Sequence, residues 1–79
     1  MAKVEITAHT GQAKVANFIV EDDCIADSAA GIADVAKAIL ARDRAAPDQI
    51  LCVCKSRADL HGSWALENGY WVRKEARNG

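Results

Sequence analysis

Residues 63–74, SWALENGYWVRK, decide the fold of this chain, because they contain its clearest turn signal. An Asn-Gly pair strongly favours a two-residue hairpin turn, since both turn positions need a positive φ angle. A turn at Asn68-Gly69 places Leu66 opposite Trp71 in the register of two antiparallel strands. The stretch therefore predicts a β-hairpin at the end of the fold.

The same register divides the side chains of the hairpin between two faces, because strand residues alternate in direction. Trp64 and Trp71 fall on one face with Arg73, and Tyr70 falls on the other. Phe18 is the only phenylalanine, so a domain of this size needs the buried area of its tryptophans. We expect both tryptophans to pack against a helix, with Tyr70 on the outer face.

The segment before this hairpin predicts one helix followed by one strand. The helix is expected to run from Ser28 to Arg44, because Pro47 cannot continue it. Asp27 or Ser28 can cap its first turn. QILCVC, residues 49–54, is an apolar run that predicts a strand buried on both faces, hence a central one. The apolar stripe expected on the helix consists of Ile32, Val35, Ala36, Ile39 and Leu40.

An N-terminal hairpin completes the predicted elements. Residues 3–9, KVEITAH, alternate polar and apolar, and residues 13–20, AKVANFIV, follow after a turn. The second strand is apolar on both faces, whereas a strand covered on only one side usually shows a clear alternation of apolar and polar residues. Either the outer sheet face is partly covered, or this strand lies near a dimer or partner interface. We predict a homodimer through Ala13–Val20.

These elements predict an α+β fold, with a single helix packed on a mainly antiparallel sheet and the order β-β-α-β-β-β. Residues 1–79 are expected to form a single small domain, because no linker, repeat or low-complexity segment divides them. A chain this short buries only about 60% of its unfolded surface, so tight packing or oligomerisation is expected.

Composition argues against several classes of protein. Three cysteines are an odd number, and no signal peptide is evident, which together favour a reduced cytoplasmic location. No apolar run reaches the length needed to span a bilayer, so no membrane association is expected. The 51% of hydrophobic and 27% of charged residues are typical of a globular protein rather than a disordered one.

Charge is distributed unevenly along the chain, although the net charge is only −1. Residues 1–40 carry three lysines and six acidic residues, whereas residues 41–79 carry seven basic and five acidic ones. A nucleic-acid-binding protein usually has a clear positive excess, because neutralising phosphates supplies much of its affinity. The segregated charge favours a protein partner with matching patches and makes direct nucleic-acid binding less favoured.

No catalytic or metal-binding pattern stands out among the reactive side chains. Cys52 and Cys54 point to the same sheet face, which favours packing in the core. A metal site would need further ligands from Cys24, His9 or His61, and no CxxC pair or histidine spacing supports one. No GxGxxG or GK[ST] motif is present either. We therefore expect no enzyme activity, no cofactor and no bound metal.

Two groups of residues are the candidates for contact with a partner. The hairpin offers an outward tyrosine beside basic residues, and Tyr and Arg are enriched at binding hot spots. The acidic run before the helix has two interpretations. It is a polar connection with a cap, or it competes with nucleic-acid phosphates for a basic protein groove. The candidate partner-binding residues are Glu21, Asp22, Asp23, Asp27, Tyr70, Arg73 and Lys74.

A nucleic-acid-binding domain is the alternative interpretation of the closing hairpin. Exposed aromatic side chains on a sheet face stack on bases, and neighbouring basic residues contact phosphates. The residues that would do so here are Trp64, Tyr70, Trp71, Arg73, Lys74 and Arg77.

In format, the chain resembles the small anti-CRISPR proteins of phages and mobile elements, the type I inhibitors in particular. The matching features are a short N-terminal hairpin, the Ala-rich helix SAAGIADVAKAILARD, the strand QILCVC and the closing hairpin SWALENGYWVRK. The resemblance implies a non-enzymatic protein that binds a bacterial CRISPR surveillance complex in the cytoplasm of the host cell. It further implies that binding blocks target DNA binding or nuclease recruitment.

Overall fold

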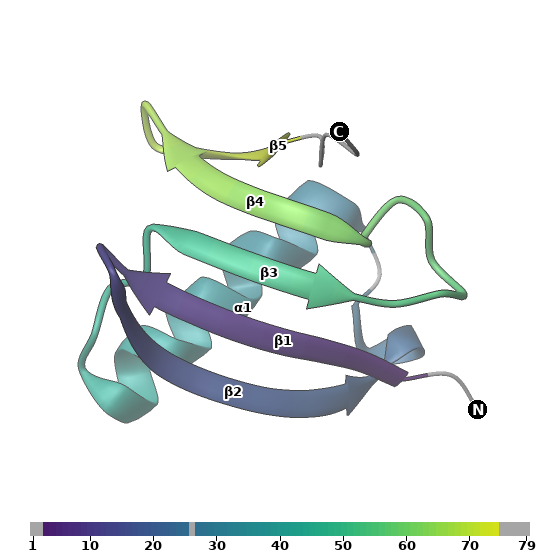
Figure 1. Cartoon of the computed structure of the whole chain (residues 1–79), viewed down its shortest axis with the longest axis horizontal. Coiled ribbons are helices and arrows are strands. Elements are labelled where there is room, and N and C mark those ends of the chain that lie inside the picture. Colours follow the sequence, from purple (N-terminus) through teal and green to yellow (C-terminus); the bar gives the residue numbers. More distant parts are fainter. Residues whose placement is uncertain (1–2, 26, 75–79) are drawn as a thin grey trace.

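A computed structural model describes residues 3–25 and 27–74 of the chain. Within these residues, five strands and one α-helix form two layers, with α1 behind the sheet in Figure 1. A short 3-10 helix, η1, joins the second strand to the helix. The elements are β1 (Lys3–Thr10), β2 (Ala13–Glu21), η1 (Asp22–Cys24), α1 (Ser28–Asp43), β3 (Gln49–Val53), β4 (Gly62–Glu67) and β5 (Tyr70–Lys74).

The strands form an antiparallel sheet with the spatial order β2-β1-β3-β4-β5 (Figure 1). The predicted α+β fold and the element order β-β-α-β-β-β are both confirmed. The prediction that QILCVC is a central strand is also confirmed, because β3 lies third of the five described strands. The two edges of the sheet are β2 and β5, so the N-terminal and C-terminal hairpins each supply one edge.

The closing hairpin has the predicted register. Asn68 and Gly69 occupy the turn with φ angles of 54° and 83°, which is the backbone conformation that an Asn-Gly turn supplies. Leu66 therefore faces Trp71 across the strands. Trp64 pairs with Arg73 in the same way, as the sequence predicts.

The N-terminal hairpin contains one irregularity. Ala8 pairs with Ala16, but His9 pairs with Lys14, so Val15 is an extra residue on β2. Such a β-bulge increases the local twist of the strand that contains it. From Ala16 onward, the pairing of β2 with β1 is regular.

The helix begins at Ser28, as predicted, and ends at Asp43, one residue earlier than predicted. The side chain of Asp27 makes no capping hydrogen bond, so the predicted side-chain cap at this position is wrong. Its backbone carbonyl accepts a hydrogen bond from the Gly31 amide at 2.7 Å instead. Arg44 ends the helix in the left-handed conformation, with a φ angle of 56°, and its amide donates to the carbonyl of Leu40.

The core lies between α1 and the inner face of the sheet. Trp64 is buried there and its Nε1 donates to the carbonyl of Leu60 at 3.0 Å. Trp71 is half-buried against the same cluster, so the prediction that both tryptophans pack on the helix side is confirmed. The buried hydrophobic residues are Val4, Ile6, Ala8, Ala16, Ile25, Ile32, Ile39, Ile50, Cys52, Cys54, Leu60 and Trp64.

The outer face of the sheet, unlike the inner face, is covered by no described element. Leu51 and Val53 of β3 are 43% and 41% exposed, whereas Ile50 and Cys52 are buried. The prediction that β3 is buried on both faces is therefore wrong. A single helix covers only one side of a sheet, so the outward half of this apolar strand remains in contact with solvent. None of the helices in the described part of the chain is long and apolar enough to cross a bilayer.

Candidate protein-binding surface on the outer sheet face

Large apolar side chains gather on the outer face of the sheet. They are between 40% and 75% exposed and come from β2, β3 and β5. A protein of this size rarely exposes this many large apolar residues on one face unless they contact something. We refer to this set as the outer strip. Among the described residues it consists of Ile19, Leu51, Val53, Tyr70 and Val72.

The strand register shows that the outer strip runs diagonally across the sheet. At one end, Ile19 and Val53 lie on either side of Glu5 on the neighbouring strands. Leu51 follows Val53 by two residues on β3, which keeps both on the same face. At the other end, Val72 pairs with Ala65 of β4, so the strip continues onto β5.

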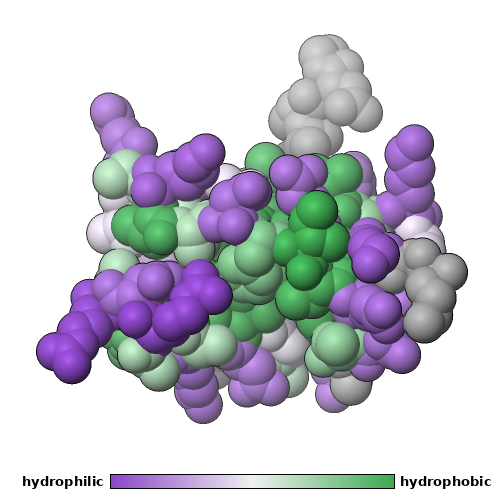
Figure 2. Space-filling model, turned by 90° about the horizontal axis from the view of Figure 1, so that it is seen from below, coloured by the Kyte–Doolittle hydropathy of each residue, from purple (hydrophilic) through white to green (hydrophobic). Residues whose placement is uncertain are grey.

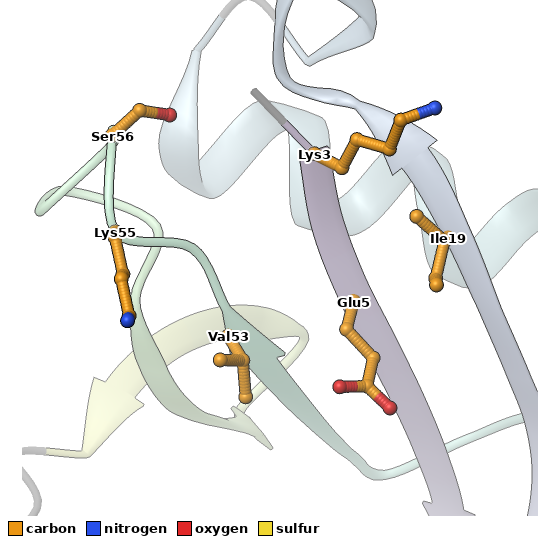
Figure 3. A pocket seen from close by; sticks show the side chains of 6 residues that line it. All are labelled: Lys3, Glu5, Ile19, Val53, Lys55 and Ser56. Atoms are coloured by element: carbon orange, nitrogen blue, oxygen red, sulfur yellow. The ribbon is translucent and has the colours of Figure 1, made fainter. Parts of the chain in front are cut away.

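A shallow depression of about 400 Å³ lies at the β2 end of the outer strip. Figure 3 shows the Glu5 side chain reaching into it between Val53 and Ile19, with lysine side chains near its rim. The lysines are Lys3 at the start of β1 and Lys55 just after β3. One carboxylate and two ammonium groups between apolar walls give this depression both signs of charge, which fits a partner surface that presents acidic and basic side chains together.

The β5 end of the outer strip carries an aromatic side chain and an ion pair. Tyr70 is 75% exposed, the highest value among the large apolar side chains described. Lys74 forms an ion pair with Glu67 on the same face of the hairpin. Both partners of this pair are about half exposed, so it stabilises the fold little and leaves its charges accessible to a partner.

Arg73 occupies a different place from the other predicted contact residues of the hairpin. It lies on the inner side of β5 opposite Trp64. Its guanidinium donates to the backbone carbonyls of Ala58, at 2.5 Å, and His61, at 3.3 Å. These bonds attach β5 to the loop between β3 and β4, which is a structural role.

The acidic residues lie at the other edge of the sheet, where β2 passes into α1. Asp22 is bound within the fold, because its carboxylate accepts a hydrogen bond from Ser56 at 2.8 Å. Its backbone carbonyl accepts another from Arg57 at 3.1 Å. Asp23 and Asp27 are exposed, whereas Glu21 is half-buried.

The structure therefore does not bring the predicted contact residues together into one patch. The acidic group adjoins β2, whereas the hairpin group lies on β5, with three strands between them. The outer strip was missed in the sequence, apart from Tyr70. One signal for it was available: Leu51 and Val53 alternate with the two cysteines of QILCVC, so half of that strand faces away from the core.

Two cysteines and one histidine lie around the end of β3, where Cys52 and Cys54 are buried and His61 is hydrogen-bonded to the backbone. Burial, together with the neighbouring Cys54, raises the pKa of the Cys52 thiol to about 11, so this group is neutral at pH 7. The Nδ1 atom of His61 accepts a hydrogen bond from the Cys54 amide at 3.1 Å, which fixes the loop after β3. Within the described ranges, no group of three or more His, Cys, Asp or Glu side chains is placed to hold a metal ion.

Two of the residues that a nucleic-acid-binding hairpin would use, Trp64 and Arg73, are hydrogen-bonded within the fold. Trp64 is buried and hydrogen-bonded, so its ring is not available to stack on a base. Arg73 is held by two carbonyl groups of the fold. Tyr70 and Lys74 remain accessible, and Arg77 lies outside the described residues.

Comparisons with known proteins found no match to this chain. No protein-family model matches the chain. No curated protein and no solved structure gives a significant match either.

Proposed function

We propose that this protein is a non-enzymatic inhibitor that binds another protein through its outer strip. The observation that carries the proposal is the exposure of Ile19, Leu51, Val53, Tyr70 and Val72 on a sheet face that no described element covers. Burying exposed apolar area is the main favourable contribution to most protein associations, at roughly 25 cal/mol per Å².

The arrangement of the surface has the anatomy of a protein interface. Apolar side chains form its centre, while Lys3, Lys55 and the Lys74–Glu67 pair supply charge at its rim. Interfaces commonly combine an apolar core with a polar rim and are enriched in tyrosine. Tyr70 at one end and the Glu5 depression at the other give the surface two positions that distinguish one partner from another.

The partner we propose is a bacterial CRISPR surveillance complex, on the basis of the resemblance in format to type I anti-CRISPR proteins. A bound domain of 79 residues would block target DNA binding or nuclease recruitment by covering a surface of the complex, without any chemical step. The protein would act in the cytoplasm of the bacterial host cell.

The decisive experiment measures binding of the purified protein to type I surveillance complexes, together with target DNA binding by each complex. Leu51→Glu introduces a charge into the middle of the outer strip and should weaken binding at least about tenfold. Leu40→Glu is the matched control, because Leu40 has a similar exposure of 49% but lies on the helix. This control should bind like the unmodified protein.

Two results would overturn different parts of the proposal. Absence of binding to every type I complex tested would eliminate the anti-CRISPR assignment. Equal loss of binding in Leu51→Glu and Leu40→Glu, with both variants folded by circular dichroism, would eliminate the outer strip as the binding surface.

A further inference from the structure

The backbone of β2 offers a second binding surface, separate from the outer strip. β2 is an edge strand of nine residues, so one side of it carries N–H and C=O groups that no neighbouring strand pairs within the described chain. An edge of this kind pairs readily with another strand.

The usual protections of an edge strand are weak over most of β2. Proteins commonly block edges with proline, with lysine in the strand centre, or with a bulge. Here the bulge at Val15 and the single lysine, Lys14, both lie at the beginning of the strand. The segment Ala16–Val20 is uncharged and contains no proline or glycine. The opposite edge, β5, has five residues, two of which are basic.

Apolar side chains flank the free edge on both sides. On the outer face, Ile19 is 61% exposed. On the inner face, a groove of about 350 Å³ between β2 and α1 is lined mainly by apolar side chains such as Phe18, Val20 and Val35, together with Asp27 and Asp34. Figure 2, which views the molecule from the β2 side of Figure 1, shows hydrophobic residues gathered in the middle with hydrophilic ones around them. Pairing along β2 would bury side chains as well as satisfy the backbone.

Charge decides which occupant fits this edge. Lys14 lies at one end of β2 and Glu21 at the other, and no other charged residue lies on the strand. When two copies of β2 pair antiparallel about a two-fold axis near Phe18, Lys14 of each copy lies near Glu21 of the other. A parallel arrangement would place like charges opposite one another. The strand is therefore complementary to itself in the antiparallel orientation, as an isologous dimer requires.

We propose that two copies of this chain associate through antiparallel β2–β2 pairing, which forms one continuous sheet of ten strands from the described parts of both copies. The two outer strips meet at Ile19 near the axis and become a single, longer surface. The dimer does not depend on the partner proposed above, because it forms from this chain alone.

The test is a charge exchange followed by sedimentation equilibrium of the full chain over a range of concentrations. The unmodified protein should reach twice the monomer mass of 8.5 kDa. Lys14→Glu and Glu21→Lys should each raise the dissociation constant by about tenfold or more, because each places like charges opposite one another at both ends of the pairing. The double variant should return to within about threefold of the unmodified protein.

Lys37→Glu is the matched control, since it reverses an exposed charge on α1 on the side of the helix that faces β5 rather than β2, and it should leave the dissociation constant unchanged. Amide hydrogen exchange provides a second readout: protection of β2 amides should rise with protein concentration, whereas protection of β5 amides should not. A monomer at every concentration, including one that captures an extended peptide on β2, would overturn the proposal. So would a double variant that associates more weakly than either single variant.

Discussion

Gly31 of α1 lies directly against the side chain of Ile25, so that a Cβ atom at position 31 would overlap Cγ2 of Ile25. Both residues are buried where the chain turns from η1 into the helix. Glycine is ordinarily unfavourable inside a helix, by about 1 kcal/mol relative to alanine. Its presence here is explained by the close approach of Ile25, because no residue with a Cβ fits the space.

Gly31→Ala should therefore destabilise the protein, against the usual direction of this substitution in a helix. Overpacking of a buried site costs about 1–3 kcal/mol, so after the gain of about 1 kcal/mol from helix propensity the net loss is up to about 2 kcal/mol. The free energy of unfolding, measured by urea denaturation, should fall accordingly.

A double variant separates steric overlap from other causes. In the background of Ile25→Ala, which removes the overlapping atom, Gly31→Ala should be neutral or stabilising. If Gly31→Ala destabilises the two backgrounds equally, the contact with Ile25 is not the reason for the glycine.

Replacing Trp64 should change both the free energy of unfolding and the tryptophan fluorescence of the protein. Trp64→Phe removes the hydrogen bond to the carbonyl of Leu60 and leaves space in a buried site. A loss of about 2 kcal/mol or more is expected, because an unpaired buried carbonyl and a cavity both cost free energy. Trp71→Phe is the comparison and should cost less, since Trp71 is only half-buried. Iodide should quench the emission of the Trp64→Phe variant more strongly than that of Trp71→Phe.

Much of this fold is predictable from local patterns in the sequence. The Asn68-Gly69 pair determines the hairpin register because few residues adopt positive φ at both turn positions. The helical spacing of Ile32 and Ile39 identifies the buried face of α1, but Leu40, which the sequence predicts on the same stripe, is 49% exposed. The apolar run of β3 correctly indicates a central strand. These signals depend on backbone geometry and periodicity, which a single sequence contains.

The candidate site is less predictable, because it depends on what is absent from one face and on contacts between distant segments. The exposure of Leu51 and Val53 follows from the lack of a second described layer, and an apolar run does not show how many layers cover it. Arg73 and Asp22 are charged residues that appear free in the sequence. Their partners lie 15 and 34 residues away, and only the fold brings them together.

The Arg57–Asp59 pair should make stability depend on pH in the acidic range. Arg57 donates to both oxygens of Asp59, at 3.0 and 2.9 Å, and these hydrogen bonds lower the pKa of the Asp59 carboxyl below its ordinary 3.8. Asp22 also faces this guanidinium. Because the folded pKa is lowered, the stabilisation is present above pH 3.8 and is lost as the pH falls through the folded value.

Asp59→Asn tests this pair directly. The variant should be less stable than the unmodified protein at pH 7, and the difference should shrink as the pH falls below about 4. Thermal unfolding at a series of pH values gives the measurement. Ala58→Ser, at an exposed neighbouring position that keeps both charges, should show no such trend. A difference that stays constant down to pH 2 would contradict the role of the pair.

The three cysteines should differ sharply in reactivity, because the fold exposes one and buries two. Cys24 is exposed in η1, whereas Cys52 and Cys54 are buried in the core. The thiolate is the reactive form, and the pKa of Cys52 is raised to about 11 by burial first and by Cys54 second. Under native conditions at pH 8, iodoacetamide should modify Cys24 rapidly and the other two only as the protein unfolds.

The raised pKa also predicts a loss of stability in the alkaline range. Because the fold favours the neutral thiol of Cys52, this contribution is fully present below about pH 9 and is lost as the pH rises through about 11. Cys52→Ala should remove that part of the pH dependence, while Cys24→Ala, at the exposed position, should leave it unchanged.

For the alkylation experiment, mass spectrometry of the modified peptides identifies the order in which the three cysteines react. Rapid native alkylation of Cys52 would show that the inner face of β3 is open to solvent, contrary to the packing described for the core.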